Sequence, residues 1–481
     1  MSYIKSSAID LIDAIAERIT KLSDDIWDHP ETCYTEVESA ALQKAVLAEL
    51  GFQIEENLAG IPTAFSGRIG SGKPVIGVLG EFDALSGLSQ VAGVAAEEPL
   101  IAGANGHGCG HNLLGSASIA AAYAAGQYLR ENGLPGTVIY YGCPAEEGGS
   151  GKGFMARDGV FDELDCAITW HPGDLNVVVP TSSLANVVVR YCFHGIAAHA
   201  AGAPELGRSA LDAVTLMNTG VQFLREHVIQ EARIHYAVTD TGGVSPNVVQ
   251  AKAEVLYMIR APRIDQVMEI ADRVDDVAKG AALMTGTTME RIFVKATSNL
   301  VPNRALNEVL QENMEATPLP VFDEADQTFA KAIIKSYAMR SSSLGSHLNR
   351  VKGEEAAALR GHLDDPIYNF VLPLSEDESA MPGSTDVGDC SWVTPTAQIG
   401  AVTMAADTPG HSWQLVSQGK SPIAHKGELF AAKVMAGAVI DLFDHPEIVG
   451  KAQEEHADRL EHKKFISPIP KDVRPAALIG R

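Results

Sequence analysis

The sequence predicts an α/β fold in two parts, an open mixed-sheet domain and a smaller domain inserted into it. Apolar strand patterns and helical patterns alternate up to residue 184, and the alternation resumes near residue 300. Between these points, residues 185–299 follow the order strand, helix, strand, strand, helix, strand, which is that of a ferredoxin-like βαββαβ sandwich. A chain of 481 residues also exceeds one typical hydrophobic core, which favours two domains.

The open-sheet domain is expected over residues 1–184 and 300–481. Helix is expected from residue 7 to about 52, with a break at "DHPE" (28–31). Residues 73–85 form an apolar run that ends in acids, which is typical of a buried strand. A helix of small residues (112–132) and strands within 136–144 and 159–172 follow. Functional residues of such a sheet gather at the carboxyl ends of its strands.

The inserted domain and the last third of the chain show the same kind of pattern. Strands are expected at 184–195, 233–240, 250–261 and 287–297, and helices at 207–228 and 265–284. After residue 300, helical segments, a strand at 396–406 and a final helix at 427–443 resume the first domain. Residues 340–385 are rich in Ser, Gly, Asp and Glu, and we expect them to form a loop.

Composition and charge argue against several classes of partner. The chain is 46% apolar and 20% charged, which is ordinary for a globular protein. No apolar run reaches the roughly 20 residues that cross a bilayer, and the N-terminal segment favours an acid-containing amphipathic helix over a signal peptide. The net charge of −24 disfavours nucleic acid and anionic membranes. The six cysteines lack framework spacing, which indicates free thiols, and we expect a cytoplasmic protein.

Side chains of metal-ligand type follow the predicted strands one after another. They are Asp83 in "GEFDAL", Cys109 and His111 in "GCGH", Glu146 and Glu147 in "CPAEEGG", His171 in "TWHP" and, late in the chain, His411 in "TPGHSW". Thiolate, imidazole and carboxylate are ligands of divalent ions such as Zn or Mn. Each motif alone is more often a packed or solvated group than a ligand. Their convergence at strand ends favours a metal site.

The acid pair suggests hydrolysis. In the glycine-rich turn "EEGGSGKG", Glu146 and Glu147 can both face one cavity. One carboxylate could bind metal while its neighbour takes a proton from the attacking water. Competing motifs fail, because "GRIGSGKP" has Pro74 where a phosphate-binding loop needs Ser or Thr, and no G-x-S-x-G occurs.

Longer stretches carry a family resemblance that runs over nearly the whole chain. They include "GEFDALSGLSQ", "NGHGCGHNLLG", "YGCPAEEGGSGK", "GIAAHAA" and "HSWQLVSQGKSPIAHKG". With these motifs the sequence resembles the metal-dependent aminoacylase and carboxypeptidase family, in its branch of N-acyl-amino-acid amidohydrolases. The resemblance implies an open-sheet catalytic domain with two divalent metal ions (Mn or Zn) and an inserted domain that acts as a lid or in dimerisation.

The resemblance also implies roles for individual residues. Ligand positions fall on Cys109, His111, Glu147, His171 and His411, and catalytic positions on Glu146, Asp83 and His199. The broader family has His-x-Asp where this chain has Glu81-Phe82-Asp83, so the metal bridge must differ, and Cys109 is the candidate. His425 is an alternative to His411, which we prefer because it follows a strand.

In the inserted domain, His199 matches the family histidine that reaches the reacting carbonyl, often from a partner subunit. Asn247 and Arg260 match the pair that binds the α-carboxylate of the substrate. Without the resemblance, packing or surface roles would be favoured for His199 and Arg260. Arg260 would supply the local positive charge that an acidic protein needs for an anionic substrate.

The function implied is hydrolysis of the amide of N-acyl amino acids, such as p-aminobenzoyl-glutamate or a similar aromatic acyl-glutamate or acyl-aspartate. Two alternatives stay open. One is a dipeptidase or hippurate-type hydrolase of neutral substrates. The other is one subunit of a heteromeric hydrolase that needs a paralogous partner. The expected partners are therefore a small-molecule substrate and either a second copy of the chain or a paralogous subunit.

Overall fold

The computed structural model describes residues 10–349 and 354–475, which divide into two compact units. The large unit contains the residues up to Thr181, Val301–Ser379 and Cys390–Phe465. The inserted unit contains Ser182–Leu300, together with Ala380–Asp389 and the described residues from Ile466 to residue 475. Two short segments from the last third of the chain thus join the inserted unit.

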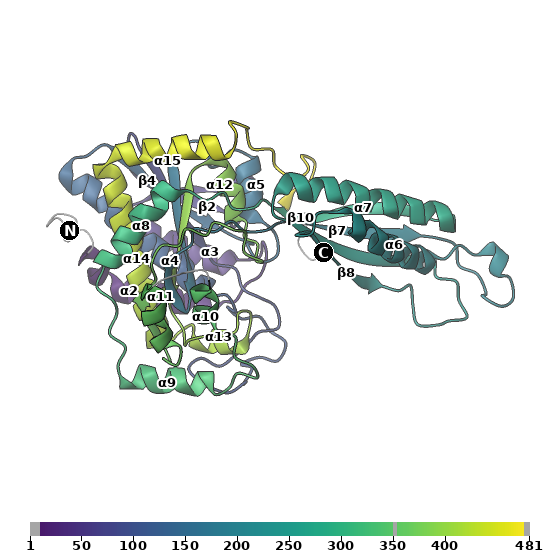
Figure 1. The fold of residues 1–481 in the computed structure, drawn as a ribbon, viewed down its shortest axis with the longest axis horizontal. Coiled ribbons are helices and arrows are strands. Elements are labelled where there is room, and N and C mark those ends of the chain that lie inside the picture. The colour runs from purple at the N-terminus through teal and green to yellow at the C-terminus, as the bar shows by residue number, and fades with distance from the viewer. Residues whose placement is uncertain (1–9, 350–353, 476–481) are drawn as a thin grey trace. The chain divides into compact units, whose positions relative to one another are not determined.

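The large unit is built on a mixed sheet of eight strands (Figure 1). In spatial order the strands are β1 (Gln53–Glu56), β2 (Phe65–Ser71), β4 (Gly136–Cys143), β3 (Val75–Glu81), β5 (Cys166–Gly173), β12 (Thr396–Val402), β6 (Leu175–Val178) and β11 (Tyr368–Val371). β4, β3, β5 and β12 run parallel to one another. β3 and β4 are buried along their whole length, as the apolar runs predict. Their carboxyl ends lie at one edge of the sheet.

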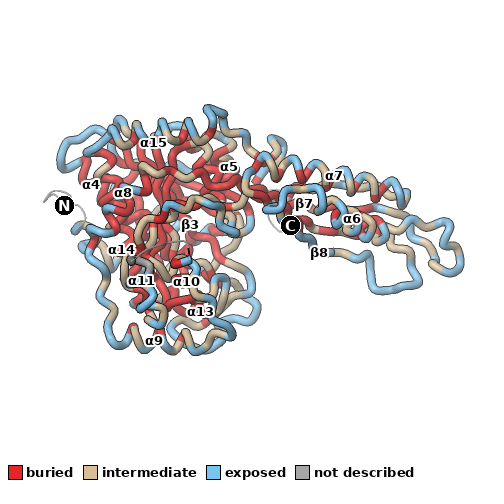
Figure 2. Tube along the Cα trace, viewed as in Figure 1, coloured by how far each residue is buried: buried red, intermediate tan, exposed pale blue. Residues whose placement is uncertain are grey.

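Helices surround this sheet. They are α2 (Ala16–Trp27), α3 (Val37–Glu49), α4 (His111–Asn132), α5 (Gly151–Arg157), α8 (Arg304–Ala316), α9 (Glu324–Ile334), α13 (Trp413–Gln418), α14 (Pro422–Asp444) and α15 (Pro446–Arg459), with α12 (Val387–Val393) at the junction of two segments. Figure 2 shows the buried positions concentrated in the strands and in the helices against them. No helix in the described part of the chain combines the length and apolar character needed to cross a membrane.

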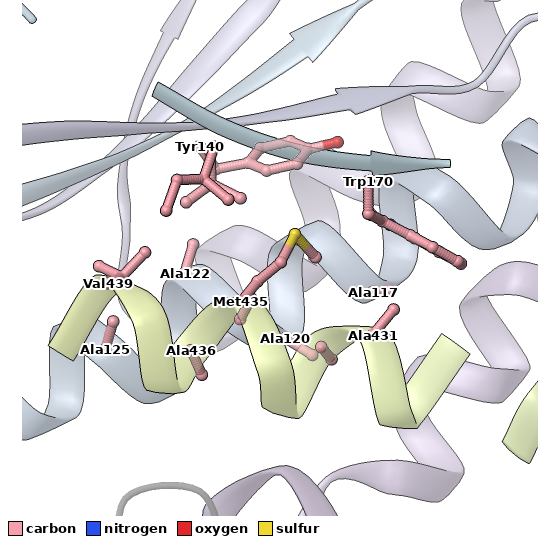
Figure 3. Packing of buried hydrophobic residues seen from close by; sticks show 14 of the residues in the cluster. Ala117, Ala120, Ala122, Ala125, Tyr140, Trp170, Ala431, Met435, Ala436 and Val439 are labelled. Atoms are coloured by element: carbon pink, nitrogen blue, oxygen red, sulfur yellow. The ribbon is translucent and has the colours of Figure 1, made fainter. Parts of the chain in front are cut away.

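The core of the large unit depends on the small side chains of α4. Figure 3 shows α4 and α14 side by side below the strands, with Ala117, Ala120 and Ala436 close to the interface. Trp170 of β5 points from the sheet toward these helices, and the ring of Tyr140 of β4 lies along the strands above them. At Gly126 a Cβ atom would lie 2.2 Å from Cγ2 of Ile69 in β2. A glycine is therefore needed where α4 packs against Ile69.

The inserted unit has the predicted βαββαβ order. Its elements are β7 (Ala185–His194), α6 (Ala210–Leu224), β8 (Arg233–Asp240), β9 (Lys252–Ala261), α7 (Ile264–Thr285) and β10 (Thr288–Thr297). The strands form an antiparallel sheet in the order β10-β7-β9-β8. Buried residues alternate along β9, since α6 and α7 cover one face of the sheet (Figure 1). The predicted fold class is confirmed.

The expectation of a loop over residues 340–385 is wrong. This segment contains α10 (Ser343–Leu348), α11 (Glu354–Leu359), a 3-10 turn (Arg360–His362) and β11. Leu344, Leu348 and Tyr368 are buried in a small apolar cluster. These few apolar anchors are diluted by polar neighbours, so the average composition of the segment does not reveal them.

We predict that Gly126→Ala destabilises the protein. The new methyl group would collide with Ile69, and overpacking of this kind costs about 1–3 kcal/mol of the free energy of unfolding. The matched control is Gly450→Ala in α15, where nothing lies within 4 Å of the new Cβ. That change should stabilise the protein by about 0.5–1 kcal/mol through helix propensity. Thermal and denaturant unfolding check both, and equal effects of the two substitutions would contradict the packing argument.

Candidate metal centre

The parallel strands bring the predicted ligand residues together at one edge of the large unit's sheet. His171 lies in β5, and Glu147 lies in the turn after β4. Cys109 lies in the loop before α4, His111 is the first residue of α4, and His411 follows β12. Residues separated by 302 positions in the sequence thus share one site. The reason is that the segments after parallel strands emerge at the same edge.

Two groups of ligand atoms share the sulfur of Cys109. Cys109, His111 and His171 form one group, and Cys109, Glu147 and His411 form the other. Within each group the ligand atoms lie within 4.8 Å of one another. Cys109 Sγ is 3.4 Å from Nε2 of His171, and Nε2 of His411 is 3.4 Å from a carboxylate oxygen of Glu147. The arrangement fits two neighbouring divalent ions with a thiolate between them.

His111 and His171 both turn their Nε2 atoms toward the site. Nδ1 of His111 lies 2.9 Å from Oδ1 of Asp83, and Nδ1 of His171 lies 2.8 Å from the carbonyl oxygen of Pro172. These acceptors hold a proton on Nδ1, so Nε2 is the ring atom that can bind a metal ion when the ring is neutral. Nε2 of His111 is buried without a hydrogen-bond partner. A metal ion would satisfy this atom, so the residues fit the group that the sequence implies.

Backbone geometry explains the glycines of "GCGH". Gly110 precedes α4 with a φ of 74°, in the left-handed region that glycine tolerates best. A Cβ atom at Gly110 would lie 2.9 Å from Cβ of Pro172, the residue after His171. The backbone N–H of His411 donates to the carbonyl oxygen of Gly108 at 3.0 Å. The loop thus packs directly against the segments that carry both other histidines.

The two acids of the pair face different neighbours. A carboxylate oxygen of Glu147 belongs to the group with Cys109 and His411, whereas one of Glu146 lies within 4.8 Å of ligand-type atoms of His111 and Glu81. Asp83 Oδ2 accepts a hydrogen bond of 2.9 Å from the backbone N–H of Glu147. Asp83 therefore orients both His111 and the turn of the acid pair.

A buried ion pair beside the site was missed at the level of sequence. Lys152 Nζ lies 2.6 Å from Oε1 of Glu81, and both side chains are buried. The other oxygen of Glu81 lies 3.2 Å from Nε2 of His111, without forming a hydrogen bond. Burial opposes ionisation of Glu81, but the charges of Lys152 and His111 hold its pKa below the usual value. The only sequence signal is a lysine within the small-residue run "GGSGKG".

Burial and neighbouring charges shift the titration of the site. Burial raises the pKa of Cys109 to about 12, and a thiol with that pKa ionises at neutral pH only beside a cation. Burial also lowers the pKa of His171, with a further contribution from the charge of His111. Burial alone would lower the pKa of His111, but Cys109 and the hydrogen bond to Asp83 raise it well above its usual value. The protonation of Cys109, His171 and His111 therefore depends on the charged groups beside them.

The remaining predicted residues lie elsewhere. His425 lies in α14, where its Nε2 is 2.9 Å from a carboxylate oxygen of Asp24, so it is His411 that the fold brings to Cys109. His199 and Asn247 lie in the inserted unit on adjoining segments, joined by a 3.0 Å hydrogen bond from the N–H of Ala200 to the carbonyl oxygen of Asn247.

Arg260, on β9 of the inserted unit, is partly buried. Its guanidinium donates to the carbonyl oxygen of Pro382 at 3.2 Å. A second guanidinium nitrogen lies 3.2 Å from Sδ of Met258. Both contacts are made within the inserted unit.

Comparisons with known proteins show which family the chain is similar to. The pattern of Peptidase family M20/M25/M40 matches residues 80–462. The chain is 48% identical over 474 residues to a subunit of p-aminobenzoyl-glutamate hydrolase from Escherichia coli (strain K12), with 98% of both chains covered. It is 27% identical to Xaa-Arg dipeptidase of Mus musculus, over 97% of this chain and 95% of that one.

A solved structure shares the fold. It is that of aminobenzoyl-glutamate utilization protein from Klebsiella pneumoniae, with a TM-score of 0.58 and 16% identity, and the match covers 90% of this chain and 97% of that one. At this identity the likeness concerns the fold alone.

We predict that Lys152→Met destabilises the protein strongly. It leaves the Glu81 carboxylate buried without its cation, and breaking a buried pair costs about 3–5 kcal/mol. The double variant Lys152→Met with Glu81→Gln should recover most of that loss. Lys73→Met is the matched control, because it breaks a pair whose lysine is 65% exposed and should cost at most about 1 kcal/mol. Denaturant unfolding measures all three, and a small loss in Lys152→Met would show that the pair adds little.

Proposed function

The chain belongs to the peptidase family M20/M25/M40, and on this basis we propose that it hydrolyses the amide of p-aminobenzoyl-glutamate. It is an enzyme that acts on amide bonds. The observation that carries the proposed substrate is the 48% identity over nearly the full length to a subunit of p-aminobenzoyl-glutamate hydrolase. Related aromatic acyl conjugates of glutamate or aspartate belong to the same substrate class.

Two divalent ions, Mn or Zn, would be held by the groups that share Cys109. Cys109, His111 and His171 would hold one ion, and Cys109, Glu147 and His411 the other. The orphaned Nε2 of His111 and the orienting contacts of Asp83 support this assignment. When bound, such ions act as Lewis acids that polarise a carbonyl group and ease the ionisation of water.

Glu146 would act as the general base and then as the general acid. Its carboxylate takes a proton from water as the water oxygen attacks the amide carbon, and it delivers that proton to the nitrogen as the C–N bond breaks. The position of Glu146, next to the ligand Glu147 and within 4.8 Å of His111 and Glu81, supports this role. Asp83 would contribute by orienting His111 and the turn that carries both acids.

Three residues of the inserted unit would bind the substrate. Nδ1 of His199 accepts hydrogen bonds from the N–H groups of Ala201 (3.2 Å) and Gly202 (3.0 Å), so the proton resides on Nε2. This N–H can donate to the oxygen that gains charge in the transition state. Asn247 and Arg260 would bind the α-carboxylate, and the planar guanidinium of Arg260 suits this group in a chain of net charge −24. In this role the inserted unit is a lid.

The enzyme would act with a second copy of the chain or with a paralogous partner. The 48% identical relative is one subunit of a hydrolase, which supports an assembly. The cytoplasm is the proposed location, supported by the spacing of the six cysteines, which is not that of a disulfide framework. A second candidate function is hydrolysis of neutral dipeptides or hippurate-type amides, which the similarity to a dipeptidase supports.

We predict that Cys109→Ala abolishes binding of both metal ions. Wild-type protein should hold about two ions per chain, as two-metal hydrolases do. Because Cys109 belongs to both groups, its loss should affect both ions, whereas His411→Ala should affect one. Cys166→Ala, which removes a buried thiol at the start of β5, should leave the metal content unchanged. Equilibrium dialysis with elemental analysis measures this, and a Cys109→Ala protein that keeps both ions would refute the shared ligand.

We predict that p-aminobenzoyl-glutamate is cleaved with at least about tenfold higher kcat/KM than benzoyl-glycine. Benzoyl-glycine keeps the α-carboxylate but lacks the side-chain carboxylate of glutamate, and a site built for a polar group discriminates strongly against analogues without it. Glu146→Gln should lower kcat about 100-fold to 10,000-fold while the ions stay bound. The control Glu163→Gln changes an exposed acid paired with Arg68 and should have no effect.

The same assay separates the alternatives. Preference for benzoyl-glycine would favour the hippurate-type function, and preference for a dipeptide would favour the dipeptidase function. Activity that appears only after a paralogous partner is added would assign the chain to a heteromer. A Glu146→Gln variant with normal kcat and bound ions would refute the proposed mechanism.

A further inference from the structure

The turn that carries Glu146 is held from both sides by buried carboxyl groups. The backbone N–H of Ala145 donates to Oε1 of Glu36 at 3.0 Å, and the N–H of Glu147 donates to Oδ2 of Asp83 at 2.9 Å. The peptide groups before Ala145 and after Glu146 are thus fixed by two different side chains. Asp83 belongs to the candidate metal centre, but Glu36 has no role in what has been derived above.

Glu36 comes from a distant part of the chain and is completely buried. It is the residue before α3, more than 100 positions from the turn, and it has no exposed surface. The same Oε1 atom accepts from the N–H of Tyr34 at 2.9 Å, and Oε2 accepts from Oγ1 of Thr63 at 3.1 Å. The Tyr34 hydroxyl donates to the carbonyl oxygen of Gly149 at 2.7 Å. The 34–36 segment therefore holds both ends of the turn.

The backbone of the turn needs such support. Ala145 has a φ of 61°, in the left-handed region that residues with a Cβ atom disfavour. The N–H of Gly149 donates back to the carbonyl oxygen of Ala145 at 2.9 Å, which closes the turn. The direction of the Glu146 side chain follows from the dihedral angles of these residues. A relaxed Ala145 would turn the Glu146 carboxylate away from its present neighbours.

We propose that Glu36 is a positioning residue for Glu146, which it acts on by holding the N–H of Ala145. This inference rests on the proposed role of Glu146 as the proton carrier. The hydrogen bonds of Glu36 described above join it to Tyr34, Thr63 and the turn, and not to the atoms of the candidate metal groups. Loss of Glu36 should therefore impair proton transfer while the metal ions and the substrate still bind.

The amide group of a glutamine at position 36 closely resembles the neutral carboxyl group of Glu36 in size and shape. Burial, with repulsion from Asp83, raises the pKa of Glu36 to about 8, so the carboxyl is mostly neutral at pH 7. The amide oxygen of Glu36→Gln can accept both N–H groups, and its NH₂ can face Thr63. Alanine removes the acceptor, and aspartate places it one methylene too far from Ala145.

The experiment compares Glu36→Ala, Glu36→Asp and Glu36→Gln in the full chain, each alone and combined with Glu146→Gln. We expect kcat to fall about 10-fold to 100-fold in Glu36→Ala, as for a misplaced catalytic group, with KM and metal content unchanged. Glu36→Asp should also lower kcat, and Glu36→Gln should stay within about threefold of wild type. In the Glu146→Gln background, the changes at position 36 should have no further effect on kcat. Thr63→Val is the control for disturbing the same buried region without releasing Ala145.

Hydrogen exchange gives a readout that does not depend on activity. The Ala145 amide should exchange faster in Glu36→Ala than in wild type and Glu36→Gln. Unchanged exchange, a normal kcat in Glu36→Ala, or an equal loss of kcat in Glu36→Gln would overturn the role of Glu36. So would a further loss in the Glu146→Gln background. If Glu36→Ala does not fold, a normal kcat in Glu36→Asp would overturn the role. A wild-type chain without amidase activity would overturn the proposed function and this role with it.

Discussion

The buried carboxylate of Asp83 is the contact on which the candidate metal centre depends. One of its oxygens lies 2.9 Å from Nδ1 of His111, and the other accepts the N–H of Glu147 at 2.9 Å. It thus joins the end of β3, the start of α4 and the turn after β4. His111 Nε2 and the Glu147 carboxylate take their directions from this one side chain. The position of Asp83 depends in turn on the parallel strands, because they bring these three segments to a single edge of the sheet.

Such a site buries more charge than a protein interior tolerates without compensation. Glu81, Asp83, His111 and Lys152 are all buried, and Glu36 lies close to Asp83. An isolated buried charge is costly, so each of these groups must be paired or neutral. Glu81 is paired with Lys152, Asp83 with His111, and Glu36 remains mostly protonated at neutral pH. The electrostatic cost is therefore offset locally, by partners drawn from three separate segments.

The rest of the large unit supplies the rigidity that such a cluster requires. α4 begins at His111 and runs for 22 residues through the core, so the first ligand of the helix is fixed by the packing of its whole length. Its small side chains let it lie against the sheet on one side and α14 on the other (Figure 3). A helix N-terminus also favours nearby negative charge, which suits the carboxylates that gather there. The packing of α4 in the core therefore also fixes the position of His111 in the candidate metal centre.

The fold class, the order of elements in the inserted unit and the family could all be predicted from the amino-acid sequence, because apolar periodicity and contiguous motifs such as "NGHGCGHNLLG" encode them. The same patterns marked Cys109, His111, Glu147 and His411 as candidates, since each stands close to a recognisable strand or turn. They did not reveal that residues 340–385 contain helices, because a few buried side chains decide that segment.

Which candidates meet depends on how the chain packs in three dimensions. Packing brought His411 and not His425 to Cys109, and it divided the ligand atoms into two groups with a common sulfur. It also paired Glu81 with Lys152 and placed Glu36 against the turn of Glu146. The physical reason is that these contacts join residues 71 to 302 positions apart in the chain. Local patterns fix strands and helices, but the distance between two side chains is set by how those elements pack.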